Sequence, residues 1–147
     1  MKKIKVAKKI LKFIENYINN INLNEIKYGR DIGYTHLNSF CVQVGPKLAY
    51  RVRYQDQQWT IFQEEGGGSL NFVRNSLYIK GKDLSKKEHA ELRDYFIRVW
   101  KIVDKKIIIM DERAEKIRDL EQINEIIKIV DNPIDNILLS DEDDEDK

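Results

Sequence analysis

No glycine and no proline occurs in the 51 residues from 82 to 132. Because these two residue types are the commonest interrupters of helices, their absence over so long a stretch predicts a helical region. Apolar residues recur through the stretch at broadly helical spacing. Ser85 and Glu88 fit a capping box, in which each side chain caps the backbone of the other at the start of a helix. We therefore expect a helix to begin at about residue 86.

The apolar run in the middle of this stretch indicates a possible interruption. Residues 105–110, KKIIIM, present apolar side chains to every side of a helix, which favours a buried joint or a short strand. We predict two helices with a kink or break between them, and one long helix is the alternative. The two predicted helices cover about residues 86–106 and 111–130.

An amphipathic helix is predicted at the N-terminus. Its apolar residues recur at steps of three and four, which places them on one face that packs on a core. Lysines fall largely on the other faces, where they lie in solvent or meet an anionic partner. The apolar positions are Ile4, Ala7, Leu11, Ile14, Ile18 and Ile21, and the lysines are Lys2, Lys5, Lys9 and Lys12.

Alternating polar and apolar residues between the helical regions predict an antiparallel sheet. Residues 22–39 are polar and are expected to form a loop with at most one short strand. The predicted strands cover residues 40–44, 47–54, 57–64 and 70–80, the last one bulged near Arg74 and Asn75.

A two-residue turn at Gln55 and Asp56 would pair Val52 with Trp59. Because side chains alternate along a strand, this pairing divides the residues between two faces. We expect Leu48, Tyr50, Val52, Trp59 and Ile61 on the buried face, and Arg51, Arg53, Thr60 and Phe62 on the opposite face.

Together these elements predict the α+β class, with an antiparallel sheet of three to four strands packed on the two helical regions. Residues 1–130 are expected to form one domain. Residues 131–147 are expected to form a disordered acidic tail.

Charge separates along the chain. Residues 1–130 carry 25 Lys and Arg against 17 Asp and Glu, whereas residues 131–147 carry one Lys against eight acids. The formal net charge of +1 therefore conceals a basic body and an acidic end. This separation favours a binding protein with an electrostatic partner.

Several classes of protein do not fit the sequence. The single Cys41 excludes an internal disulfide and argues against a cysteine-based zinc site, so we expect no metal and no cofactor. No apolar run approaches the length of a membrane span, and the charged N-terminus does not fit a signal peptide. We therefore expect a cytoplasmic protein. Its many Ile, Lys and Asn residues are typical of AT-rich genomes, those of phages included.

Signals for catalysis are weak. Cys41 is expected in the core, with His36 as a distant candidate base, and His89 is expected on an early helical turn. The polar segment from Asp31 to His36, which contains Tyr34, could line a pocket, but its spacing matches no catalytic or metal motif. We expect no enzyme, and a small enzyme with a pocket near Asp31–His36 is the third hypothesis.

A basic and aromatic face of the sheet is the first candidate site. Arginines bind phosphates, and an exposed aromatic ring offers a platform on which a base can stack. Lysines at the start of the following helix lie beside backbone donors that also favour phosphate. The predicted nucleic-acid-binding residues are Arg51, Arg53, Phe62, Lys80, Lys82, Lys86 and Lys87.

Within this set, the segment GKDLSKKEHAEL at residues 81–92 resembles the double-stranded RNA-binding domain. That family ends its sheet at a glycine-rich turn and begins a helix at a Ser-Lys-Lys element that contacts phosphates. Leu92, Arg93, Asp94 and Tyr95 depart from it, because the family prefers small residues there, and the segment between first helix and sheet is longer. The resemblance covers about residues 46–96 and rests on Gly81, Lys82, Ser85, Lys86, Lys87 and Ala90, with Pro46 and Tyr50 in the first strand.

The C-terminal segment is the second candidate site, because apolar residues precede a dense acidic run that suits a groove on another protein. The leading hypothesis is a non-enzymatic accessory protein that acts through protein contacts, as an adaptor, an inhibitor or a virion component. The alternative is a nucleic-acid-binding protein with the tail as autoinhibitor, and the N-terminal or C-terminal helices could form a homo-oligomer. The predicted partner-binding residues are Ile134, Ile137, Leu138, Leu139, Asp141, Glu142, Asp143 and Asp144.

Overall fold

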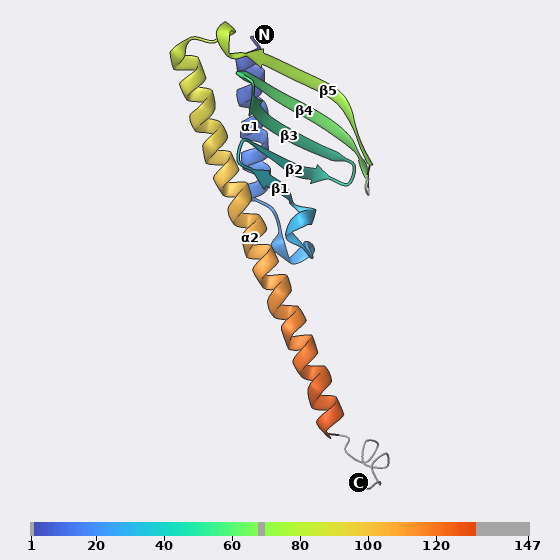
Figure 1. Cartoon of the computed structure of the whole chain (residues 1–147). Helices are drawn as coiled ribbons and strands as arrows, with labels where there is room; N and C mark the ends of the chain where they lie inside the picture. Colours follow the sequence, from blue (N-terminus) through green and yellow to red (C-terminus); the bar gives the residue numbers. More distant parts are fainter. Residues whose placement is uncertain (1, 68–69, 132–147) are drawn as a thin grey trace. The chain divides into compact units, whose positions relative to one another are not determined.

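The computed structural model describes residues 2–67 and 70–131, and the predicted partner-binding residues from Ile134 to Asp144 lie outside them. The chain divides into two compact units, Met1–Asp111 and Glu112–Lys147. The first unit contains the sheet (Figure 1). Its elements are α1 (Lys3–Asn19), β1 (Gly33–His36), β2 (Ser39–Gly45), β3 (Leu48–Gln55), β4 (Gln58–Gly67), β5 (Leu70–Lys80) and the start of α2 (Lys86–Asp131), with short 3₁₀ turns at Leu23–Glu25 (η1), Gly29–Asp31 (η2) and Gly81–Asp83 (η3).

The sheet is an antiparallel meander in which each strand pairs with the next along the chain. It confirms the predicted α+β class, with five strands where three to four were expected. The additional strand is β1, which pairs with β2 through residues predicted to be a loop with at most one short strand. The predicted bulge is also present: Gln63 pairs with Asn75 and Glu64 with Val73, so Arg74 has no partner in the register.

The turn between β3 and β4 lies one residue later than predicted. Asp56 and Gln57 form it, with φ of 53° and 60°, the left-handed conformations that a tight hairpin requires. Val52 therefore pairs with Ile61, and the predicted pairing of Val52 with Trp59 is wrong. The shift amounts to two positions, so each side chain keeps its predicted face.

Helix α1 packs on one face of the sheet with the side predicted from its spacing. Ile4, Leu11 and Ile18 are among its buried residues. Two of its lysines contact neighbouring elements: Lys3 Nζ donates to the Tyr78 carbonyl at 3.0 Å, and Lys8 pairs with Glu91 at 3.1 Å. The single core joins α1, the sheet and the first part of α2; its largest fully buried side chains include Leu11, Ile14, Ile18, Phe40, Leu92 and Met110.

Helix α2 begins at the predicted capping box. The Glu88 amide donates to Ser85 Oγ at 3.1 Å, and the Ser85 amide donates to Glu88 Oε1 at 2.9 Å. The helix then continues to Asp131 without a break, so the predicted division into two helices is wrong. The isoleucines at 108 and 109 are exposed, which shows that an apolar run need not be buried on all sides when no residue in it interrupts the helix.

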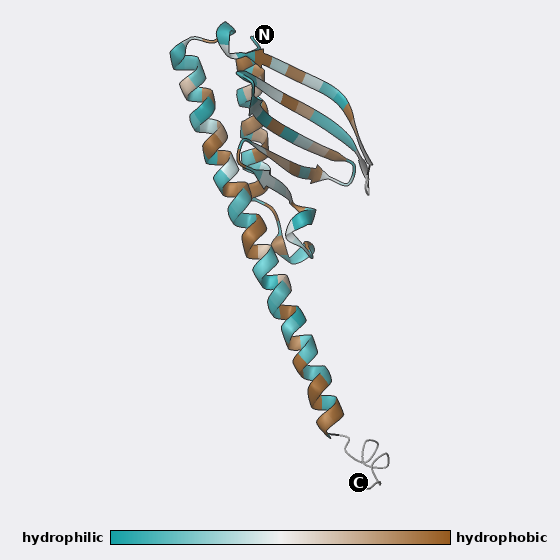
Figure 2. Cartoon of the chain, viewed as in Figure 1, coloured by the Kyte–Doolittle hydropathy of each residue, from teal (hydrophilic) through white to brown (hydrophobic). Residues whose placement is uncertain are grey.

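The second unit begins at Glu112, and its described part is the helical segment 112–131. Apolar bands alternate with polar ones along this segment (Figure 2). Among the residues that the structure describes, no helix combines the length and the apolarity that crossing a bilayer requires.

Candidate functional site

The face of the sheet that turns away from α1 carries the two predicted arginines. Arg51 and Arg53 project from β3, and Phe62 lies opposite Arg51 on β4. The guanidinium carbon of Arg51 lies 4.5 Å from the centre of the Phe62 ring, and that of Arg53 lies 5.7 Å from it. We call this surface the open face; it comprises Tyr34, Cys41, Arg51, Arg53, Thr60, Phe62, Glu64, Tyr78 and Lys80.

Phe62 supports the arginines and offers little ring to a ligand. Only 9% of this residue is exposed, because the guanidinium groups cover it. The predicted role of Phe62, a platform for a base, therefore fits the geometry poorly. Its cation–π contacts instead hold the two arginines against the sheet.

The two arginines differ in their charge partners. Arg51 donates to Glu64 Oε2 from Nε at 3.0 Å and from Nη2 at 2.7 Å, and Glu64 is 7% exposed. Arg53 forms no ion pair with any residue that the structure describes, and its buried Nε has no acceptor among them. The pair of Arg51 with Glu64 is neutral overall, so Arg53 supplies the uncompensated charge at the centre of this face.

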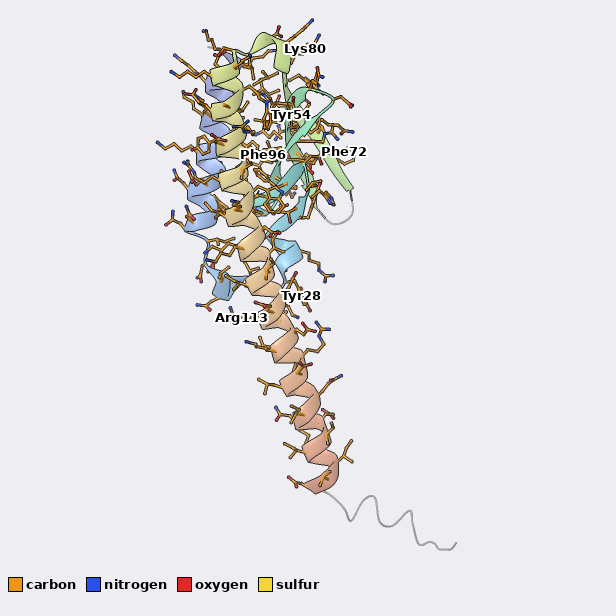
Figure 3. The ribbon with its side chains drawn as sticks, turned by 60° about the vertical axis from the view of Figure 1, so that its left-hand side comes forward. Tyr28, Tyr54, Phe72, Lys80, Phe96 and Arg113 are labelled. Atoms are coloured by element: carbon orange, nitrogen blue, oxygen red, sulfur yellow. The ribbon has the colours of Figure 1, made fainter. Side chains whose placement is uncertain are left out.

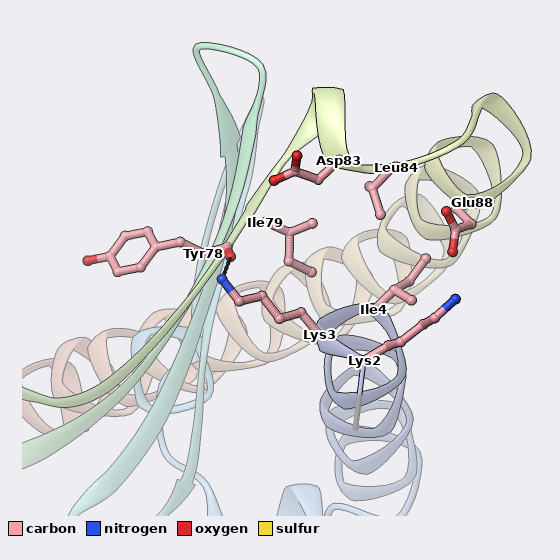
Figure 4. A pocket seen from close by; sticks show the side chains of 8 residues that line it. All are labelled: Lys2, Lys3, Ile4, Tyr78, Ile79, Asp83, Leu84 and Glu88. Atoms are coloured by element: carbon pink, nitrogen blue, oxygen red, sulfur yellow. Dashed lines mark hydrogen bonds between the residues drawn. The ribbon is translucent and has the colours of Figure 1, made fainter.

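Two tyrosines border the arginines. Tyr78 of β5 meets Phe62 edge to face, with ring centres 6.0 Å apart, and is 46% exposed. Its ring points away from α1, whereas the next side chain, Ile79, points toward α1 (Figure 4). Tyr34 of β1 is 42% exposed and packs on His36. Neither tyrosine is among the predicted nucleic-acid-binding residues, and Tyr34 was considered only for an enzyme pocket. Extending the alternation of Arg51 and Arg53 across the neighbouring strands would have placed both tyrosines on this face.

The predicted lysines divide into two groups. Lys80 pairs with Gln58 at the end of β5, so the register places it on the open face with Arg53 and Tyr78. Lys82 lies in the turn η3, and Lys86 and Lys87 begin α2, which packs on the other side of the sheet. The seven predicted residues therefore form no single patch, and four of them share the open face: Arg51, Arg53, Phe62 and Lys80.

A pocket at the start of α2 contains one of these lysines. It has a volume of about 510 Å³, and Lys86, His89 and Arg93 line it together with Tyr54. The Trp59 indole N–H donates to His89 Nδ1 at 3.4 Å. Because Nδ1 accepts this hydrogen bond, the N–H of a neutral His89 ring lies on Nε2. The Ser-Lys-Lys element of the RNA-binding resemblance thus lies at this pocket and belongs to the helical layer.

A second, smaller pocket of about 290 Å³ lies between the start of α1 and the end of β5 (Figure 4). Two of its four charged side chains, Lys3 and Glu88, already have structural partners. Lys3 binds the Tyr78 carbonyl, and Glu88 caps Ser85. The hydrogen bond between Ser85 and Glu88 lowers the pKa of the Glu88 carboxyl. Of the charged side chains that line this pocket, Lys2 and Asp83 are therefore the ones that remain for a ligand.

Cys41 is poorly suited to nucleophilic chemistry. Burial, followed by the charge of Glu64, raises the pKa of its thiol to about 11. At neutral pH the thiol stays protonated, and the protonated form is not the nucleophile. The candidate base His36 pairs in β1 with Ser39, whereas Cys41 lies opposite Tyr34.

The polar segment that could line an enzyme pocket has structural contacts. Asp31 accepts a hydrogen bond from the Tyr28 amide at 3.1 Å, and Thr35 donates to Asp104 at 2.7 Å. Neither of the two pockets above is lined by Asp31, Tyr34 or His36. Within residues 2–67 and 70–131, no group of three or more His, Cys, Asp and Glu side chains is placed to hold a metal ion.

The second unit carries a different kind of surface. Its helical segment exposes seven large apolar side chains, and five of them recur at steps of three and four, which places these five on one side of the helix. We call this surface the apolar stripe, and each member is between 48% and 65% exposed; it comprises Ile117, Leu120, Ile123, Ile127 and Val130. Helical spacing places Glu121 and Glu125 on the opposite side of the same segment. Ile126 and Ile129 are also exposed and lie outside the stripe. In Figure 3 the segment follows Arg113.

Comparisons with known proteins give no relative for this chain. No protein-family model matches it, and neither do the curated proteins or the solved structures.

Proposed function

We propose that this chain is a non-enzymatic accessory protein that binds another protein through the apolar stripe. The observation that supports this proposal is the exposure of five large aliphatic side chains along one side of residues 112–131. An exposed helix side of this kind is costly to leave in water and is typical of helices that dock in a groove.

Charge favours a separate partner over a second copy paired helix to helix. Residues 112–147 carry 13 Asp and Glu against five Lys and Arg. Two such segments side by side would repel one another, because both have a net charge of −8. The proposed partner therefore presents an apolar groove bordered by basic residues, which the acidic residues 141–146 would also contact.

Photo-crosslinking tests this proposal directly. A photoreactive side chain at position 123, on the stripe, is expected to crosslink one partner protein in the native host. The same group at position 121, on the charged side, is the control and should yield little of that product. Reconstitution with the purified partner should then show that Leu120→Gln with Ile127→Gln abolishes binding, whereas Glu121→Gln with Glu125→Gln retains it.

Two results would contradict the proposal. Equal crosslinking from positions 121 and 123 would mean that the stripe has no preferred role. A crosslinked product formed only between copies of this chain, together with a concentration-dependent dimer in light scattering, would replace the separate partner with a second copy.

A further inference from the structure

We propose that the open face binds single-stranded nucleic acid, with Arg53 and Lys80 contacting phosphates and Tyr78 stacking on a base. This inference concerns the first unit only. It does not depend on the protein partner proposed for the apolar stripe.

The charge of the first unit suits a polyanion. Residues 1–111 contain 21 Lys and Arg against 12 Asp and Glu. Among the residues named above for the open face, Glu64 is the one carboxylate, and Arg51 neutralises it at 2.7 Å. The remaining cations, Arg53 and Lys80, therefore determine the sign of the face, which is positive.

The guanidinium of Arg53 is fixed in position and has no carboxylate partner among the described residues. Its guanidinium lies over the Phe62 ring, and no described residue supplies it with a carboxylate. Its Nε is buried without an acceptor, so the Nη groups are the part of the guanidinium that a phosphate would reach. A guanidinium whose position is fixed by stacking loses less entropy when it binds a phosphate than a free side chain does.

The exposed tyrosines indicate which polyanion fits. Tyr78 and Tyr34 lie on the outer strands β5 and β1, about 19 Å apart at the usual spacing of neighbouring strands. Exposed aromatic rings can stack on unpaired bases, and proteins that bind single strands combine such rings with cations that follow the backbone. A duplex would hide its base faces from both rings, and an acidic peptide would leave them without a stacking partner.

Fluorescence anisotropy with a labelled 12-residue oligothymidylate, and with its oligouridylate counterpart, provides the test. Arg53→Gln with Lys80→Gln is expected to weaken binding at least about tenfold and to reduce the salt slope by about two phosphate contacts. Tyr78→Ala is expected to weaken binding about fivefold or more. The matched control, Lys9→Gln with Lys12→Gln on α1, removes the same charge from the other layer and is expected to change binding less than threefold.

Four outcomes would overturn the proposal. Equal losses in the two double variants would mean that binding follows net charge alone. If Tyr78→Ala bound the oligonucleotides with unchanged affinity, Tyr78 would not stack on a base. If the protein bound a duplex of the same sequence equally well, it would not recognise single strands. A polyaspartate peptide that binds as tightly as the oligonucleotides would show that the ligand is an acidic protein. Tyr78 is exposed, so its variant tests the face even if Arg53→Gln fails to fold.

Discussion

Arg51 and Glu64 form a chelate on the open face, in which two guanidinium nitrogens donate to one carboxylate oxygen at 3.0 and 2.7 Å. Glu64 is nearly buried, whereas Arg51 keeps about a quarter of its side chain exposed. A carboxylate in this position depends on its partner, because water can replace little of what the guanidinium supplies.

Removing the arginine alone is therefore expected to destabilise the protein. Arg51→Met leaves the Glu64 charge without its partner and should lower the free energy of unfolding by about 2 kcal/mol in urea denaturation. Arg51→Met combined with Glu64→Gln should recover part of that loss, because the double variant contains no unpaired charge. Additive losses in the double-mutant cycle would mean that the two side chains stabilise the fold independently.

Cys41 gives a prediction for pH dependence. The folded pKa of about 11 lies above the ordinary value of 9, so the folded state keeps the proton that the unfolded state loses. The contribution of Cys41 to stability is therefore constant below about pH 9 and falls as pH rises toward 11. The free energies of unfolding of the natural protein and of Cys41→Ala, measured from pH 7 to 11, should converge or cross in that window. The variant has no thiol to deprotonate, so it does not lose this contribution.

The same burial should protect the thiol chemically. Because Cys41 is the single cysteine, a colorimetric disulfide reagent reports on it without ambiguity. At pH 8 we expect slow labelling of the folded protein and rapid labelling in urea. Rapid labelling without denaturant would contradict the inert thiol described above.

Gly29 lies where η2 meets α2. Its amide donates to Asp111 Oδ1 at 3.0 Å, and a methyl group at this position would contact the Asp111 carboxylate and approach the Ile107 carbonyl to 2.7 Å. Gly29→Ala should therefore lower the free energy of unfolding by about 1–3 kcal/mol, through overpacking. Gly45→Ala is the matched control, since its added methyl group would meet no atom within 4 Å, and its stability should change by less than about 0.5 kcal/mol.

The sequence predicted most of the faces correctly because side-chain periodicity depends on the element and not on its exact ends. The turn at Asp56 shows this: the pairing moved by two positions, and Val52 and Arg51 kept their predicted faces. The position of the turn could not be predicted, because neither Gln55 nor Gln57 has a strong preference for left-handed φ.

Helix α2 and Phe62 show what local patterns miss. The isoleucines near Met110 predicted a break because they suggested burial, and burial depends on whether another element covers them. Phe62 was predicted to be an exposed ring, and the cation–π contacts that cover it become visible only when β3 and β4 are in register. In both cases the exposure of the side chains depends on tertiary neighbours, which a local sequence pattern does not contain.

The acidic end of the chain gives the last prediction, which concerns competition for the open face. Deleting residues 132–147 removes seven acids and one lysine and changes the net charge from +1 to +7. If these acids compete with phosphates, the shortened chain should bind the labelled oligonucleotide several-fold more tightly in 50 mM salt. The gain should shrink in 300 mM salt, because screening weakens the competing attraction.

A variant of full length separates charge from the loss of the segment. Replacing the acids of residues 141–146 with Asn and Gln keeps Ile134, Ile137, Leu138 and Leu139 and removes six negative charges. This variant should reproduce the gain if charge is the cause. If deletion and neutralisation both leave the affinity unchanged in low salt, the acidic segment does not mask the basic unit. In that case, the role that remains for residues 132–147 is contact with the protein partner. The same two variants should then bind that partner more weakly.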